Sequence, residues 1–161
     1  MIMSGGEPWL RSVTRREFEE WLPRAESRYA EYILASGAMP LAQARQKARR
    51  DTQRAFSAGF DTPGQLVFRV MVGEERVGWL WLAIPAGDAD PCMGWVNNVE
   101  IEGAFRGRGY GRAAMGLAEQ EARSRGMTSI GLNVHGQNTV ARSLYDSLGY
   151  QVMTQQMRKT L

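Results

Sequence analysis

The fold depends on Arg106-Gly107-Arg108-Gly109-Tyr110-Gly111-Arg112, a stretch that joins a predicted strand to a predicted helix. The strand runs from about Met93 to Ile101 and is rich in β-branched and aromatic side chains. The helix runs from about Gly109 to Ser124 and carries apolar side chains at helical spacing. Backbone N–H groups at a helix start lack internal partners and carry a partial positive charge, so this loop is a candidate anion site.

The composition of this loop suits a diphosphate. Glycines let phosphate oxygens approach the backbone, and Arg106, Arg108 and Arg112 add positive charge. A guanidinium group suits phosphate because its planar donors bind two oxygens at once. The alternative for such a loop, taken alone, is a glycine-rich turn with solvated arginines, and both interpretations stay open at this point.

Two other phosphate-binding loops fit the sequence less well. A P-loop needs a lysine followed by serine or threonine after its last glycine, where this chain has Arg112-Ala113. The stretch from Gly109 to Ala114 matches the dinucleotide pattern G-x-G-x-x-A. However, the ribose-binding acid expected roughly 20 residues later is missing, and too little chain remains for a doubly wound sheet.

Length and composition indicate an ordinary globular protein with one domain. The 161 residues are 43% hydrophobic and 23% charged, close to globular averages. One cysteine, Cys92, and one histidine, His135, form neither a disulfide nor a structural zinc set, so we expect no metal. No stretch approaches the roughly 20 apolar residues of a membrane span, and no basic segment followed by an apolar run begins the sequence. We therefore expect a cytoplasmic protein without a membrane partner.

The basic surplus comes from arginine, which supplies 18 of the 20 basic residues and gives a net charge of +3. Such a surplus attracts nucleic acid or a polyanionic cofactor. The densest basic stretch, from Arg45 to Arg54, has no interleaved aromatic residues to stack on bases, and a charge run on a helix is usually its solvated face. We therefore expect no nucleic-acid partner.

The other elements follow from periodicity and from helix-breaking residues. Thr14-Arg15-Arg16-Glu17 is typical of a capping box, so a first helix begins there, and Pro23 is expected to kink or divide it. A second helix is predicted from about Leu41 to Phe56. After this helix the spacing of apolar residues changes from helical to alternating or continuous, which is typical of strands. The remaining predictions are a hairpin of Leu66 to Val72 with Arg76 to Ile84, a strand from Ser129 to Val134, a helix from Thr139 to Leu148 and a final strand near Tyr150 to Met157, with a further strand at Leu10 to Val13 left open.

A second motif follows the glycine loop. After Leu132-Asn133-Val134 the chain continues as Gly136-Gln137-Asn138-Thr139-Val140-Ala141-Arg142-Ser143-Leu144-Tyr145-Asp146-Ser147-Leu148-Gly149-Tyr150. This stretch resembles the second signature of the GNAT superfamily of N-acetyltransferases, N-x-x-A-x-x-L-Y-x-x-L-G-F/Y. The loop from Arg106 to Gly111 resembles the first signature, R/Q-x-x-G-x-G/A. Together the motifs cover about residues 95 to 157, in the order and at the spacing of the family.

The resemblance implies a GNAT-like α/β fold of the α+β type. Its central sheet is mixed and twisted, carries helices on both faces and contains two splayed parallel strands, here Trp95 to Ile101 and Ser129 to Val134. The implied organisation is one acetyltransferase domain over residues 1–161. Residues 14–57 form its helical amino-terminal part, and residues 66–157 form the sheet with the cofactor site.

The resemblance also implies how acetyl-CoA binds. Its pantetheine arm would lie between the splayed strands and pair with backbone groups of Val99 and Ile101. Residues Arg106 to Arg112 would hold the pyrophosphate, and Asn138 would contact the cofactor from the start of the last helix. A plain helix N-cap is the simpler role for Asn138, and the two roles are compatible.

Two residues are candidates for proton transfer. The resemblance implies that Tyr145 protonates the departing thiolate, whereas its helical spacing beside Ala141 and Leu148 equally suits a core aromatic. The attacking amine must lose a proton, directly or through water. Glu100 is our preferred general base because it lies deeper in its strand than Glu102. The alternative for Glu100 is a solvated strand residue.

We therefore expect an N-acetyltransferase that moves an acetyl group from acetyl-CoA to a primary amine of a small molecule, peptide or protein within a ternary complex. The alternative is a catalytically inactive CoA-binding or regulatory module. The sequence identifies neither the acceptor nor the oligomeric state, and a homodimer stays open. Trp79 and Trp81 share one strand face, where they form either the wall of an acceptor pocket or part of the core or of a dimer surface.

Overall fold

The computed structural model describes residues 6–85 and 92–159, which form a five-stranded sheet and four α-helices. The elements, in chain order, are β1 (Pro8–Ser12), α1 (Arg15–Ala35), α2 (Leu41–Ala55), β2 (Gln65–Val72), β3 (Glu75–Ala83), β4 (Met93–Ile101), α3 (Tyr110–Ser124), β5 (Ser129–Leu132) and α4 (Thr139–Ser147), with short 3₁₀ turns at Gly59–Asp61 and Gly103–Phe105. The strands follow one another across the sheet in this order.

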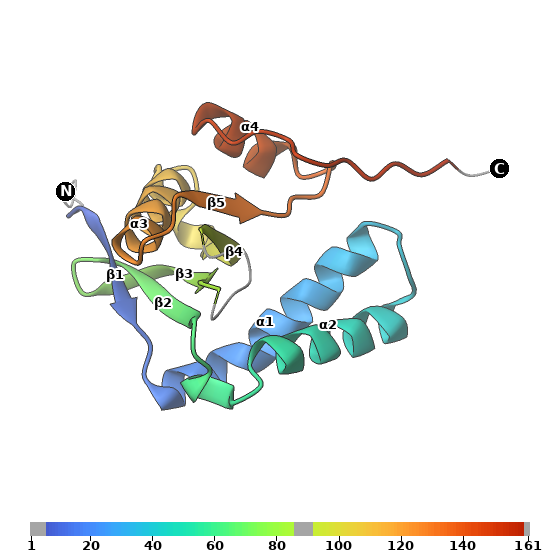
Figure 1. The fold of residues 1–161 in the computed structure, drawn as a ribbon, viewed down its shortest axis with the longest axis horizontal. Coiled ribbons are helices and arrows are strands. Elements are labelled where there is room, and N and C mark those ends of the chain that lie inside the picture. The colour runs from blue at the N-terminus through green and yellow to red at the C-terminus, as the bar shows by residue number, and fades with distance from the viewer. Residues whose placement is uncertain (1–5, 86–91, 160–161) are drawn as a thin grey trace.

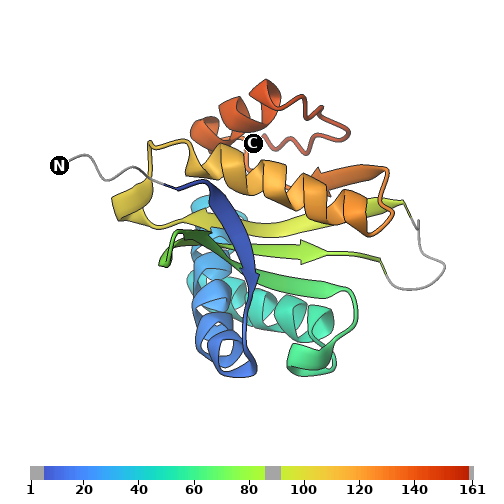
Figure 2. The same cartoon turned by 90° about the vertical axis from the view of Figure 1, so that its left-hand side faces the viewer.

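The sheet is mixed, and helices cover both of its faces. All neighbouring strands are antiparallel except β4 and β5, which are parallel. Figures 1 and 2 show α1 and α2 on one face of the sheet and α3 and α4 on the other. The predicted fold class is therefore confirmed.

Local sequence signals place the helix ends where they were expected. The Thr14 hydroxyl accepts a hydrogen bond from the Glu17 N–H group, and the Glu17 carboxylate accepts one from the Thr14 N–H group. This capping box starts α1. The helix continues without interruption to Ala35, so Pro23 does not divide it. Trp21 and Ala25, on either side of the proline, are buried and hold both parts of the helix against the sheet.

Each face of the sheet has its own hydrophobic core. On the α3 side, Leu80, Leu82 and Met115 are fully buried. On the α1 side, Trp79 and Trp81 are each only 8% exposed and pack with Trp21 and Phe56. The two strand tryptophans are therefore core residues, so of the alternatives left open for them the structure supports the core and not the wall of an acceptor pocket.

The predicted final strand near Tyr150 to Met157 does not form. Residues 151–159 have no regular secondary structure, and all nine are exposed. A strand forms only where a neighbouring strand supplies hydrogen bonds, and among the described residues β5 pairs with β4 alone. The weaker prediction of a strand at Leu10 to Val13 is correct in kind, since β1 covers Pro8–Ser12.

Candidate active site

The two parallel strands separate halfway along β4. Their pairing begins at Met93 with Ser129 and ends at Val96 with Leu132. Strand β4 continues to Ile101, whereas β5 stops. The last part of β4, residues 97–101, therefore has β3 on one side and, among the described residues, no strand on the other. This opening between β4 and β5 is the splay that the sequence predicts.

An irregularity in β4 marks the start of the opening. On the β3 side, Trp81 is opposite Asn98 and Leu82 is opposite Val96, so Asn97 is an extra residue in β4. A β-bulge of this kind bends its strand and increases the local twist. The bulge lies immediately after the last pair that β4 forms with β5, and it therefore accounts for the divergence of the strands.

The direction of the backbone groups in β4 can be worked out from one hydrogen bond. The Glu102 N–H group donates to the Val77 carbonyl on β3 at 2.9 Å. Backbone groups of an antiparallel strand alternate in direction along the chain. The backbone N–H and C=O groups of Glu100 therefore also face β3. The backbone N–H and C=O groups of Val99 and Ile101 face the opening. The Ile101 carbonyl already accepts a hydrogen bond from Arg106 Nε at 2.9 Å.

The glycine loop adopts the conformation of an anion cradle. Gly107 has φ of 75° and Gly109, which precedes the first residue of α3, has φ of 83°. A Cβ atom at either position would meet no atom within 4 Å, so the left-handed backbone, not crowding, requires glycine here. Within the described chain, no backbone carbonyl accepts a hydrogen bond from the N–H groups of residues 107–112. These donors are free to bind phosphate oxygens.

The three arginines of the loop surround this cradle. Besides the contact of Arg106 with Ile101, Arg112 Nη2 donates to Ser147 Oγ on α4 at 2.6 Å, and the Arg108 guanidinium lies over the Phe105 ring at 5.7 Å. All three side chains belong to exposed residues. The loop therefore combines free N–H groups with a local concentration of positive charge.

Asn138 begins α4 in the manner of an N-cap. Its side-chain oxygen accepts a hydrogen bond from the Ala141 N–H group at 3.2 Å. This is the simpler of the two roles considered for Asn138. The residue is exposed.

Tyr145 combines a packed ring with a free hydroxyl group. The ring packs against the α3-side core and lies 5.7 Å from the ring of Tyr150. The hydroxyl group makes no hydrogen bond to any residue in the described ranges. Burial and, secondarily, the nearby Tyr32 raise the pKa of Tyr145 above its ordinary value of 10. The residue therefore keeps its proton at neutral pH, as a general acid must.

Two residues that sequence reasoning did not select, Tyr32 and His135, lie at the same opening. The Tyr32 hydroxyl accepts a hydrogen bond from the His135 N–H group, and the two rings meet edge to face. Burial lowers the pKa of His135 below 6.5, so its imidazole is neutral at pH 7. Tyr32 comes from α1 and Tyr145 from α4, on opposite faces of the sheet. Side chains from both faces therefore approach each other where β4 and β5 separate.

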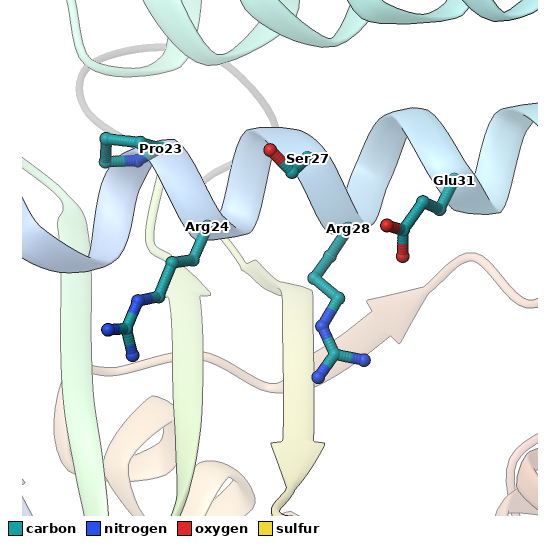
Figure 3. A pocket seen from close by; sticks show the side chains of 5 residues that line it. All are labelled: Pro23, Arg24, Ser27, Arg28 and Glu31. Atoms are coloured by element: carbon teal, nitrogen blue, oxygen red, sulfur yellow. The ribbon is translucent and has the colours of Figure 1, made fainter.

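Glu100 lies on the α1 side of β4, opposite Trp79 of β3. Its Oε1 atom forms an ion pair with Arg28 Nη2 of α1 at 2.5 Å, and its side chain is 22% exposed. Arg28 belongs to a shallow groove of about 370 Å³ that is lined by residues of α1. Figure 3 shows the side chains of Arg24 and Arg28 projecting from this helix toward the strands. Glu102 is paired with Arg76 at 2.7 Å. The carboxylate of Glu31 also lines the groove.

Residues 6–85 and 92–159 contain neither a metal-binding cluster nor a membrane-spanning helix. No group of three or more His, Cys, Asp or Glu side chains is arranged to hold a metal ion. No helix in these ranges has the length and apolar character needed to cross a membrane.

The class of protein follows from three features of the site. They are the open edge of β4, the glycine loop at the start of α3, and Tyr145 of α4 beside the opening. This combination is typical of CoA-dependent acyltransferases. Comparison with known proteins gives the family. The model of the acetyltransferase (GNAT) family matches residues 17–150. The chain belongs to this family and is an acyltransferase, and acetyltransferases of this family use acetyl-CoA.

Similar proteins support this assignment. The uncharacterized N-acetyltransferase YdgE of Bacillus subtilis is 27% identical over 157 residues, which cover 94% of this chain and 97% of YdgE. YycN of the same organism is 28% identical over 154 residues, with the same coverages. The crystal structure of YycN matches with a TM-score of 0.89 over 96% of this chain and 98% of that chain. A mycothiol acetyltransferase of Rhodococcus erythropolis is 34% identical, over 61% of this chain and 33% of that protein.

Proposed function

We propose that this protein transfers an acetyl group from acetyl-CoA to a primary amine of a small molecule, a peptide or a protein. The acceptor amine attacks directly while both substrates are bound. The observation that carries this proposal is the opening between β4 and β5. Its unpaired strand edge, residues 97–101, leads directly into the glycine loop, so one extended donor molecule can contact both.

The donor fits the residues around the opening. The backbone groups of Val99 and Ile101 face outward and would pair with the amide groups of pantetheine as an added strand does. The N–H groups of residues 107–112, with Arg106, Arg108 and Arg112, would hold the pyrophosphate. Asn138 would contact the donor from the start of α4 while it caps the helix. When bound, acetyl-CoA supplies an activated acetyl group as a thioester.

Proton transfer is assigned to groups on the two faces of the sheet. Tyr145 retains its proton and would donate it to the sulfur of the leaving thiolate. Glu100 would accept a proton from the attacking amine, directly or through a water molecule. The ion pair with Arg28 must open or rearrange for this step, because Glu100 Oε1 is occupied in the structure. Positioning of two bound substrates contributes the rest of the acceleration.

The acceptor would approach from the α1 face of the sheet. Glu100 lies on that face, and the groove on α1 that contains Arg28 lies beside it. The donor loop, by contrast, leads into α3 on the other face. Partial relatives with a named substrate include mycothiol acetyltransferases and a ribosomal protein bS18-alanine N-acetyltransferase. Both small metabolites and protein amino groups therefore belong in the search for the acceptor.

Release of free thiol from acetyl-CoA tests the proposed activity. The purified protein is incubated with acetyl-CoA and a panel of amines, polyamines, amino acids, sugars with amino groups and peptides with free amino termini. Acceptor-dependent release of CoA is expected for at least one class. The absence of such release across the panel would contradict the proposal.

Binding and turnover measured together distinguish the enzyme from an inactive CoA-binding module. A ligand that binds only the folded state raises the melting temperature, by an amount that grows with the ratio of its concentration to Kd. Both hypotheses predict such a shift with CoA. Only the enzyme predicts turnover. A shift without turnover on any acceptor would favour the inactive module, and no shift at saturating CoA would contradict both.

A further inference from the structure

The groove on α1 beside Glu100 carries charges of opposite sign at its two ends. Arg24 and Arg28 are one helical turn apart, and Glu31 follows three residues after Arg28, so the three side chains share one face of the helix. Figure 3 shows Arg24 and Arg28 projecting from α1 in the same direction, toward the strands. The groove therefore changes from positive to negative along the helix.

The two arginines of the groove differ in their partners. Arg28 Nη2 is 2.5 Å from Glu100 Oε1 of β4, which adds a second carboxylate to the negative end of the groove. Arg24 is exposed and, within the described ranges, forms no ion pair. Like charges one turn apart on a helix repel each other, so an anion bound between Arg24 and Arg28 would be stabilised by both.

The ion pair between Arg28 and Glu100 is of a kind that a ligand can open. The Arg28 side chain is 55% exposed, and an ion pair in contact with water contributes little to stability. A guanidinium group has five N–H donors in a planar fork and binds a carboxylate through two of them at once. A carboxylate of a ligand would therefore compete with Glu100 for Arg28 at small cost to the folded protein.

The opening of this ion pair is a step that the proposed reaction requires. Glu100 can accept a proton from the acceptor amine through Oε1 only when Arg28 no longer donates to that oxygen. An acceptor that carries its own carboxylate would engage Arg28 and release Glu100 as its amine arrives. An acceptor without a carboxylate leaves the ion pair in place. The structure therefore favours acceptors that carry both groups.

We propose that the acceptor is a small amino acid or a similar zwitterion, an inference that rests on the proposed function. Its carboxylate binds between Arg24 and Arg28, and its ammonium group lies at Glu100 and Glu31. Because Arg28 contacts Glu100 directly, a short carbon chain joins the two charged groups. Glu100 takes the proton of the ammonium group, the amine nitrogen bonds to the acetyl carbon, the carbon–sulfur bond breaks, and the sulfur receives a proton from Tyr145.

The test compares acceptors that differ only in the carboxylate. Glycine, β-alanine and γ-aminobutyrate are each compared with their carboxamides as acceptors, by release of free thiol from acetyl-CoA. At least one amino acid is expected to have a kcat/KM about tenfold or more above that of its carboxamide, the size of effect that a charge-assisted hydrogen bond produces. Equal values in all three pairs, or a preference for the carboxamides, would overturn the proposal.

Variants of the two arginines separate their roles. Arg24→Gln is expected to raise KM for the preferred amino acid about tenfold, so that the preference over the carboxamide falls toward one. Arg28→Gln also weakens binding of the amino acid, but it frees Glu100, so its kcat on the carboxamide is expected to exceed that of the unmodified protein. The control Arg16→Gln removes an exposed arginine of the same helix, paired with Glu20, and should keep the preference. An unchanged preference in Arg24→Gln, or a slower reaction of the carboxamide in Arg28→Gln, would contradict the proposal.

Binding without turnover separates this inference from the proposed function. The protein is saturated with CoA, which carries no acetyl group, and titrated with the same pairs of compounds while NMR follows the Nε–H signals of its arginines. The signals of Arg24 and Arg28, assigned from their absence in the two variants, should shift with an amino acid and not with its carboxamide. These shifts without turnover on any acceptor would support the zwitterion site and contradict the proposed function. Turnover on amines that lack a carboxylate, without such shifts, would overturn the zwitterion site and support the proposed function.

Discussion

Tyr145 and Tyr150 allow a test in which one hydroxyl group is removed from each of two neighbouring tyrosines. Their rings lie 5.7 Å apart, and both pack against the α3-side core. The proposed general acid is Tyr145. Tyr145→Phe is expected to leave binding of CoA unchanged and to lower kcat by about 10²-fold or more, the lower end of what a general acid contributes. Tyr150→Phe is expected to leave kcat within about twofold, since Tyr150 has no proposed role in proton transfer.

The effects of the two variants on stability are expected to be the reverse of their effects on kcat. The Tyr145 hydroxyl has no hydrogen-bond partner among the described residues, so Tyr145→Phe is expected to change the free energy of unfolding by less than about 0.5 kcal/mol. The Tyr150 hydroxyl is hydrogen-bonded to Glu119 at 3.2 Å. Its loss is expected to cost about 1–2 kcal/mol, which corresponds to a fall in Tm of a few degrees for a chain of this length.

The assay combines thiol release at saturating acetyl-CoA and acceptor with a thermal melt of the same preparations. The expected result is a slow but stable Tyr145→Phe variant and an active but less stable Tyr150→Phe variant. Turnover by Tyr145→Phe within about twofold of the unmodified protein would remove Tyr145 from the mechanism. Equal loss of turnover in both variants would show that the region affects activity through packing alone.

Three further changes test other parts of the account. Gly109→Val places a side chain at the cradle, where φ is 83°. A left-handed backbone costs a residue with a side chain roughly 1–2 kcal/mol. The variant is expected to lose the rise in Tm that CoA causes. Gly126→Val introduces the same strain at the other end of α3, where φ is also 83°, and an equal loss of the CoA effect in this control would contradict the cradle. Glu100→Gln is expected to lower kcat by about 10²-fold with little change in the Kd of CoA, and unchanged turnover would exclude Glu100 as the base. The hydrogen bond from Arg11, and after it the one from the Thr14 N–H group, lowers the pKa of Glu17 from 4.5 to about 2. The charged form of Glu17 therefore stabilises the folded protein above pH 4.5. This stabilisation is lost as the pH falls toward 2. The Tm of Glu17→Gln, measured between pH 7 and pH 2, should therefore approach the Tm of the unmodified protein at low pH. A constant difference in Tm over this range would contradict the lowered pKa of Glu17.

The features that the sequence predicts correctly are those whose cause is local. The capping box at Thr14 and the glycine loop before α3 depend on residues a few positions apart. The opening between β4 and β5 was expected from a resemblance that covers both strands. The observed pairing places it after Val96 and adds the bulge at Asn97, which no sequence signal marked.

Contacts between distant parts of the chain were not predictable in the same way. Arg28 meets Glu100, and Tyr32 meets His135, only because α1 packs beside the end of β4 and the residues after β5. His135 is the single histidine of the chain, yet its sequence neighbours give no indication of its half-buried position against Tyr32.

The error at the carboxyl end has a related cause. The sequence predicts a strand near Tyr150 to Met157, but a strand also needs a neighbouring strand to supply its hydrogen bonds. The outer edge of β5 has no partner among the described residues, and residues 151–159 do not pair with it.

Hydrogen exchange in the presence and absence of CoA tests the central claim most directly, because it reports individual backbone N–H groups. The account predicts that CoA slows exchange at Val99, at Ile101 and across residues 107–112, whose N–H groups face the opening or the cradle. Residues of α2, Leu41–Ala55, should be unaffected. Protection spread evenly over the chain, or confined to elements other than β4 and the loop, would contradict the placement of the donor.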